Sequence, residues 1–167
     1  MIHIFDTYYF EEKARTVCVS INEWTDKEIT TYFCETIEGI KQYESGAFYL
    51  RELPCITSLF NKINLIEGDI IVIDGFVILD DNHKNGLGGY LYEHLKHKNP
   101  IIGVAKNDFV KLQNLKMPIF RGDSKKPLYI TSKGIDLAVA SEYIKNMDGP
   151  YRIPTILKIV DQKSREI

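Results

Sequence analysis

The segment Asp69-Ile70-Ile71-Val72-Ile73-Asp74 gives the strongest indication of the fold. Four consecutive β-branched residues without a polar face are typical of a strand that is buried on both sides, as in a parallel sheet. Residues 100–105 repeat this pattern, and a Gly-rich stretch followed by a predicted helix over 86–96 lies between the two runs. The middle of the chain therefore predicts a β-α-β unit.

Three more strands are predicted before this unit. Residues 2–5 are mostly apolar, residues 14–22 alternate in hydrophobicity with a period of two, and residues 29–36 are rich in Thr, Tyr and Phe. These patterns are typical of strands. Because the links between them are short, we expect antiparallel neighbours.

The remaining segments predict helices and one further strand. Residues 55–63 carry apolar side chains at helical spacing, with Pro54 in a first turn, where proline is tolerated. Residues 127–131 predict a strand, and residues 135–147 and 154–163 predict helices. The order resembles that of the ribonuclease H-like fold. We expect an α/β protein with a central mixed sheet of five to six strands, three antiparallel strands and then a parallel β-α-β unit, flanked by helices.

Composition and charge limit the classes of function. The chain has 167 residues, 44% of them hydrophobic, and a formal net charge of -2, as in a globular protein without a broad basic face for nucleic acid. A local basic surface remains one interpretation of the cations between residues 106 and 133, and a solvated face is the other. These cations are Lys106, Lys111, Lys116, Arg121, Lys125, Lys126 and Lys133.

The cysteines, the apolar runs and the first residues of the chain each exclude one class of protein. Cys18, Cys34 and Cys55 form no C-x-x-C pair, so we interpret them as buried free thiols. No apolar run approaches the roughly 20 residues of a membrane helix. The first residues predict a strand rather than an export signal, and we expect a cytoplasmic protein with no membrane partner.

Two carboxylates stand where apolar strands are predicted to end. Asp6 follows the first strand and Asp74 closes the first buried one, which is where open α/β sheets place their sites. If the two strands are neighbours, the paired anions require a shared proton or a cation. Oxygen ligands suit Mg2+ or Mn2+, and the matching chemistry is phosphoryl transfer. A cap or a surface charge is the alternative for either residue alone.

Asp6 and six short blocks that follow it resemble the motifs of the endonuclease V family, in the family's order. The blocks are Tyr43-Glu44-Ser45-Gly46, Arg51-Glu52-Leu53-Pro54, Asp74-Gly75, Gly103-Val104-Ala105-Lys106, Lys126-Pro127-Leu128-Tyr129-Ile130-Thr131 and Tyr151-Arg152-Ile153-Pro154. The resemblance covers nearly the whole chain and implies one endonuclease V-like domain over residues 1–167. It also implies an Mg2+- or Mn2+-dependent endonuclease that hydrolyses phosphodiester bonds in DNA or RNA, near inosine or other deaminated bases. Separately from the resemblance, we expect a monomer.

The resemblance also implies roles for individual residues. Asp6, Glu52 and Asp74 match the family's metal ligands, Asp161 matches a fourth ligand ten residues after the tyrosine of the last block, and Lys106 matches its active-site lysine. The positions expected to contact nucleic acid are Tyr43, which matches an aromatic residue inserted beside the extruded base, and Gly46, Phe48, Gly75 and Lys106.

Several positions depart from the family pattern around these carboxylates. Asp80 replaces a histidine, Tyr90 replaces a second histidine, and Ser45 replaces a proline. Asp80 could join the metal ligands, orient a water or be a loop charge, and His83 is a candidate substitute for the missing histidine. The alternatives to an enzyme are a nucleic-acid-binding protein of the same fold without turnover, and a structural protein with vestigial carboxylates.

Overall fold

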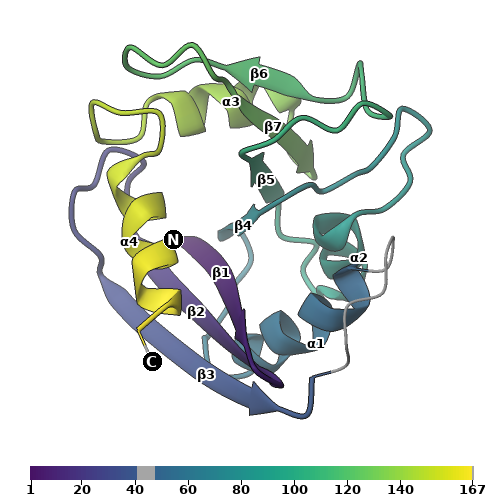
Figure 1. Ribbon diagram of the computed structural model, residues 1–167, viewed down its shortest axis with the longest axis vertical. Helices are drawn as coiled ribbons and strands as arrows, with labels where there is room; N and C mark the ends of the chain where they lie inside the picture. Colours follow the sequence, from purple (N-terminus) through teal and green to yellow (C-terminus); the bar gives the residue numbers. More distant parts are fainter. Residues whose placement is uncertain (41–47, 167) are drawn as a thin grey trace.

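The buried isoleucine-rich segment forms strand β4 (Ile70–Asp74) in the middle of a seven-stranded sheet. The computed structural model describes residues 1–40 and 48–166, and the strand order is β3-β2-β1-β4-β5-β7-β6 (Figure 1). Strand β4 pairs in parallel with β1 (Ile2–Phe10) and with β5 (Ile101–Ala105). Central, parallel placement explains why no polar side chain interrupts this run.

The other strands extend the sheet in both directions by antiparallel pairing. β1, β2 (Lys13–Ile21) and β3 (Thr31–Glu38) form a meander on one side. On the other side, β7 (Leu128–Lys133) pairs with β5 and with the edge strand β6 (Met117–Ile119). The expected α/β architecture, with three antiparallel strands followed by a parallel unit, is confirmed.

Helices cover both faces of the sheet. α1 (Phe48–Phe60) and α2 (Leu87–His94) contact one face, and α3 (Leu137–Lys145) and α4 (Thr155–Ser164) contact the other (Figure 1). Because successive side chains of a strand point to opposite faces, β4 contributes Ile71 and Ile73 to one core and Val72 to the other.

The expected strand count was too low because β6 was missed. Its three residues include Pro118, which has no N–H to donate to a ladder and which argues against a strand in the interior of a sheet. At the edge the proline is tolerated, since it lies on the outermost strand.

The expected start of the first helix was also wrong. α1 begins at Phe48, so Pro54 lies inside the helix rather than in its first turn. A proline inside a helix removes one backbone hydrogen bond. Here the turns before it still pack, because Tyr49 and Leu53 lie against the same core as Ile56 and Leu59, and tertiary packing outweighs the local preference.

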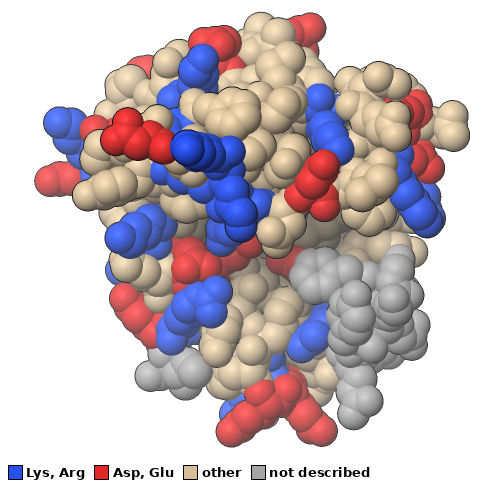
Figure 2. Space-filling model, turned by 45° about the horizontal axis from the view of Figure 1, so that its top comes forward, with Lys and Arg blue, Asp and Glu red and all other residues tan. Residues whose placement is uncertain are grey.

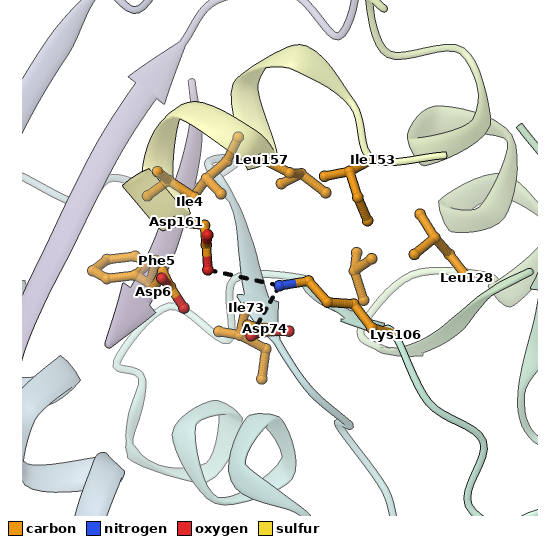
Figure 3. Close-up of a pocket in the computed structure, with 12 residues that line it drawn as sticks. Ile4, Phe5, Asp6, Ile73, Asp74, Lys106, Leu128, Ile153, Leu157 and Asp161 are labelled. Atoms are coloured by element: carbon orange, nitrogen blue, oxygen red, sulfur yellow. Dashed lines mark ion pairs between the residues drawn. The ribbon is translucent and has the colours of Figure 1, made fainter. Parts of the chain in front are cut away.

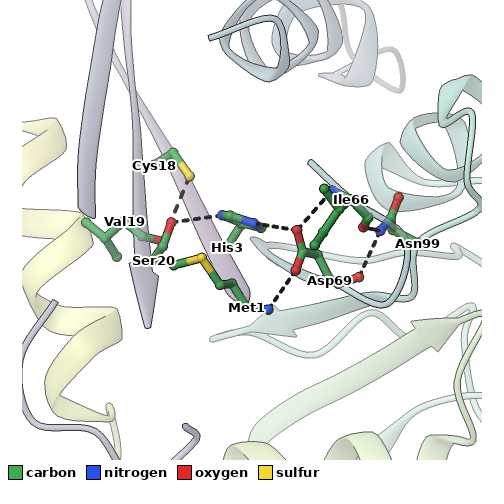
Figure 4. Close-up of polar contacts among 8 residues, drawn as sticks. All are labelled: Met1, His3, Cys18, Val19, Ser20, Ile66, Asp69 and Asn99. Atoms are coloured by element: carbon green, nitrogen blue, oxygen red, sulfur yellow. Dashed lines mark hydrogen bonds and ion pairs between the residues drawn. The ribbon is translucent and has the colours of Figure 1, made fainter. Parts of the chain in front are cut away.

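A buried polar chain joins β1, β2 and the residue before β4. His3 lies 2.8 Å from Ser20 Oγ through Nδ1 and 3.2 Å from Asp69 Oδ2 through Nε2 (Figure 4). All three side chains are buried, so this Ser-His-Asp chain is closed to substrates. Burial lowers the pKa of His3 despite the nearby Asp69 carboxylate.

Within the described residues, no helix is long and apolar enough to cross a membrane.

Candidate active site

The pairing of β1 with β4 brings Asp6 and Asp74 to neighbouring positions. The parallel register ends at Phe5 opposite Ile73, so the next residue on each strand is an aspartate. The sequence predicted that Asp6 ends its strand, which is wrong, since β1 continues to Phe10 as a hairpin arm with β2. The two carboxylates are nevertheless adjacent, because β4 stops at Asp74.

Asp6, Asp74, Asp161 and Lys106 line one pocket (Figure 3). Asp161 reaches it from α4, and Lys106 follows the end of β5. The cavity measures about 30 Å3, which is room for a water-sized group. The apolar walls are Ile4, Phe5, Ile73, Val104, Leu128, Ile153, Leu157 and Val160.

The ammonium group of Lys106 lies between two of the carboxylates. Its Nζ is 3.9 Å from Asp74 Oδ2 and 3.8 Å from Asp161 Oδ1 (Figure 3). Both distances exceed that of a hydrogen bond. The lysine therefore partly neutralises the two carboxylates without a hydrogen bond to either of them. Asp161 also pairs with Arg165, one helical turn further along α4, at 3.1 Å.

Glu52 approaches the same carboxylates from α1, on the opposite face of the sheet. Its side chain is 5% exposed, and its Oε2 has no hydrogen-bond partner among the described residues. Burial raises the pKa of Glu52 well above its ordinary value, and the negative charges of Asp74 and Asp6 raise it further. An unpartnered buried carboxylate oxygen is costly in the folded state, and the nearby negative charges of Asp74 and Asp6 add to the cost of ionising Glu52.

The pKa values of the two strand aspartates are raised as well. Burial is the main cause for Asp6, with Asp161 adding to it, while Ser164 Oγ opposes the shift by donating to Asp6 Oδ2 at 2.7 Å. For Asp74, loss of surrounding water and the nearby Asp6 and Asp161 raise the pKa to about 6 against the attraction of Lys106. Three coupled carboxylates that resist ionisation indicate a site suited to an added cation.

The donor atoms fit a hard divalent cation. Four carboxylates without a thiol or imidazole suit Mg2+ or Mn2+, and Glu52 Oε2 is a buried donor oxygen without a partner. Within residues 1–40 and 48–166, no three acidic, histidine or cysteine side chains converge closely enough to form a metal site in this arrangement. Ion binding therefore requires the carboxylates to turn toward one point.

A family model for endonuclease V matches residues 1–125. The chain belongs to the endonuclease V family. The matched range includes three of the acidic residues described above. Asp6 and Asp74 line the pocket, and Glu52 lies near them. Asp161 lies beyond the matched range. Among curated proteins, none matches the chain significantly.

Solved structures agree on the fold. The chain is similar to Ciona intestinalis endonuclease V in complex with a 24mer DNA containing an inosine followed by a ribo-adenosine, with 17% identity, a TM-score of 0.79 and coverage of 99% of this chain and 84% of that one. The chain is also similar to human endonuclease V, with 20% identity and a TM-score of 0.73. This similarity covers 99% of this chain and 82% of the human one. An Argonaute from Marinitoga piezophila gives 11% identity, a TM-score of 0.56 and coverage of 98% of this chain but 29% of that one. The expected ribonuclease H-like fold is therefore confirmed.

Asp80 and Tyr90, two positions that depart from the family pattern, make structural contacts in this endonuclease V family member. Asp80 accepts hydrogen bonds from the backbone N–H groups of Asn82 and Lys84, at 2.9 and 3.0 Å, which is the loop-charge alternative. His83 is exposed in the same loop with a φ of 62°. The ring of Tyr90 stacks on that of Tyr49, with centroids 4.0 Å apart. Among the described pocket residues, neither Asp80 nor His83 is present.

The positions expected to contact a base are only partly described. Tyr43 and Gly46, like Ser45, lie outside the described residues, and Phe48 begins α1. Gly75 directly follows Asp74 with a φ of 108°, a conformation that favours glycine. Its N–H donates to the carbonyl of Val104 at 3.0 Å, which fixes the loop beside the pocket.

The cations of residues 106–133 do not form one basic surface. Arg121 is buried and binds backbone carbonyls, and Lys116 pairs with Asp108. Figure 2 shows Lys and Arg side chains in separate groups among acidic ones, which agrees with the low net charge.

The prediction that the three cysteines are buried free thiols was wrong for Cys34, which is exposed on β3, and right for Cys18 and Cys55.

Ser164 is the site residue that the sequence did not reveal. Its hydroxyl lies 2.7 Å from Asp6 Oδ2 and 2.8 Å from the carbonyl of Asp161. The only available signal was its position three residues after Asp161, on the same side of the predicted helix.

Proposed function

We propose that this chain is an Mg2+- or Mn2+-dependent endonuclease that hydrolyses phosphodiester bonds in DNA or RNA near inosine. The observation that carries the proposal is a pocket lined by acidic side chains from β1, β4 and α4 together with a lysine, with the buried Glu52 of α1 close enough for Asp74 and Asp6 to raise its pKa. Membership of the endonuclease V family supports the nuclease activity. The inosine-containing DNA bound by the Ciona enzyme supports the substrate.

Asp6, Glu52, Asp74 and Asp161 are the proposed ligands of the ion. When bound, the ion lowers the pKa of an attacking water and stabilises the negative charge that develops on the phosphate. The chain supplies the rest. Glu52 holds its carboxylate away from bulk water, and Ser164 orients Asp6 by a hydrogen bond.

Lys106 has the proposed role of binding the phosphate that is cut. Its ammonium makes only long contacts with Asp74 and Asp161, so a phosphate oxygen can replace them. A cation placed where charge develops stabilises the transition state. Tyr43, Gly46, Phe48 and Gly75 are proposed to hold the base, and the chain is proposed to act as a monomer with one domain over residues 1–167.

The test is cleavage of an inosine-containing oligonucleotide with Mg2+ or Mn2+, by the wild type and by Asp74→Asn. We expect nicking by the wild type and a loss of about a hundred- to a thousandfold in the variant, as for the removal of a group central to charge stabilisation. Asp123→Asn, an exposed aspartate in a turn, is the matched control and should cut normally. If the wild type cuts no inosine-containing strand with either ion, the enzyme proposal is rejected.

A second candidate is a nucleic-acid-binding protein without turnover. It is favoured by one observation, the replacement of the family's histidine by Asp80, whose carboxylate caps its own loop. This candidate predicts tight binding of inosine-containing strands without product in the same assay.

A further inference from the structure

A second cleft adjoins the acidic pocket. It measures about 290 Å3 and shares Lys106, Ile153 and Asp161 with the pocket. Tyr151, Arg152 and Lys158 complete its lining. A phosphate held by Lys106 would therefore have this cleft as its immediate neighbour.

Tyr151 presents its ring to solvent from a backbone that is held in place. The side chain is 72% exposed, yet its carbonyl accepts a hydrogen bond of 2.7 Å from the buried guanidinium of Arg121. The same guanidinium also binds the carbonyl oxygens of Lys145, Met147, Gly149 and Arg152. Because one buried cation fixes this turn, the loop cannot easily fold the ring inward.

Arg152 connects this turn to the catalytic lysine. Its guanidinium donates to the carbonyl of Lys106 and, at 2.8 Å, to the carbonyl of Pro127. The position of the tyrosine is thus tied to that of Lys106 through backbone contacts. A ligand that touches both residues meets a preorganised surface, which reduces the entropy lost on binding.

Lys158 supplies a cation at the same cleft. It is exposed on α4 and forms no ion pair with any described residue. An exposed aromatic face beside an unpaired ammonium matches the base and the phosphate of one nucleotide, since stacking and charge are the two contacts by which proteins hold single strands. An acidic peptide would use the lysine but not the ring.

We propose that this cleft binds the nucleic-acid strand next to the phosphate that is cut, with Tyr151 stacking on a base and Lys158 contacting a phosphodiester. The inference rests on the proposed function, because it takes Lys106 as the phosphate-binding lysine. The proposed strand-binding site lies next to Lys106 and is formed by the turn before α4 and by Lys158 of α4.

The test measures binding separately from cutting. In an Asp74→Asn background with Mg2+, fluorescence anisotropy follows a single-stranded DNA that contains one inosine. Adding Tyr151→Ala should weaken binding by roughly 5- to 150-fold, the range for loss of one stacked base, whereas Tyr151→Phe should retain it. Adding Lys158→Gln should weaken binding and lower the salt slope by about 0.7, the value for one phosphate on a single strand.

Tyr32→Ala and Lys27→Gln are the matched controls, one on β3 and one in an exposed turn, and both should bind like the background. Unchanged binding in Tyr151→Ala and Lys158→Gln overturns the proposal that the cleft binds the strand, even if the wild type cuts. Binding that depends on Tyr151 supports the cleft, even if the wild type does not cut. A wild type that binds no strand overturns both proposals.

Discussion

At the scale of the residue, the charge state of Asp74 connects the site to pH. Its pKa is raised to about 6, so the folded chain holds a proton between about pH 4 and pH 6 that the unfolded chain has released. In the absence of an ion, the free energy of unfolding should therefore fall as the pH rises through this window. The affinity for a cation should instead increase as the pH rises, because the cation binds the ionised form of Asp74.

At Mn2+ concentrations below saturation, we expect the cleavage rate to rise with pH, because Mn2+ competes with protons for the carboxylates of the site. Ser164→Ala should move this rise to higher pH, because Asp6 loses a hydrogen bond that favours its charged form. The measurement is the logarithm of the rate against pH.

Ser141→Ala is the matched control for that shift. Ser141 is buried and donates to the carbonyl of Leu137 within α3, away from the pocket. A profile that stays in place in Ser164→Ala, or that moves equally in Ser141→Ala, would contradict the role given to Ser164.

At the scale of the element, the loop after β4 is shaped by its contact with β5. A Cβ on Gly103 would lie 2.5 Å from the carbonyl oxygen of Gly75 and 2.6 Å from Thr131 Oγ1. The same Thr131 oxygen accepts a hydrogen bond from the N–H of Val77 at 2.8 Å. The absence of a side chain at Gly103 thus lets the residue after Asp74 pass close to the sheet.

Gly103→Ala should lower the free energy of unfolding by about 1 to 3 kcal/mol, the usual cost of overpacking. It should also reduce cleavage, because the displaced loop begins at Asp74. Denaturant unfolding and initial rates measure the two effects.

Ile102→Val, at the adjacent buried position of β5, controls for a general loss of stability of about 0.5 to 1.5 kcal/mol. It should leave cleavage unchanged. Equal activity in Gly103→Ala and Ile102→Val would show that the close approach does not position the site.

Local pattern predicted the central elements and not their ends. The β-branched run at β4 and its repeat at β5 indicated a buried parallel pair directly, because burial on both faces leaves no polar position. The extra length of β1 comes from hairpin pairing with β2, whereas the start of α1 before Pro54 and the edge strand β6 depend on contacts with distant residues. Such contacts leave no periodicity in the sequence.

The candidate site was predictable in a similar, partial way. Strand ends indicated Asp6 and Asp74, while Glu52, Lys106 and Asp161 came only from the resemblance to a family. Arg121 was grouped with surface cations because a sequence does not show that five carbonyls will surround one guanidinium.

At the scale of the whole molecule, the fold brings four acidic side chains from distant segments to one region, where Asp6, Asp74 and Asp161 line the pocket and Glu52 lies near Asp6 and Asp74. Two of them belong to adjacent parallel strands, and helices on opposite faces of the sheet carry the other two. The buried carboxylates of Asp6 and Glu52 weaken the ion-free protein, and a cation bound beside them would offset this cost. Stability sacrificed at one place for chemistry is common in enzymes.

The most direct measurement is an anomalous difference map from crystals of the wild type soaked in Mn2+. The account predicts a peak bounded by Asp6, Glu52 and Asp74, with Asp161 beside it and the Lys106 ammonium displaced from its present place. The peak should be absent from Asp74→Asn crystals soaked in the same way. A wild-type map without a peak in this pocket, or with Mn2+ bound only elsewhere, would contradict the central claim.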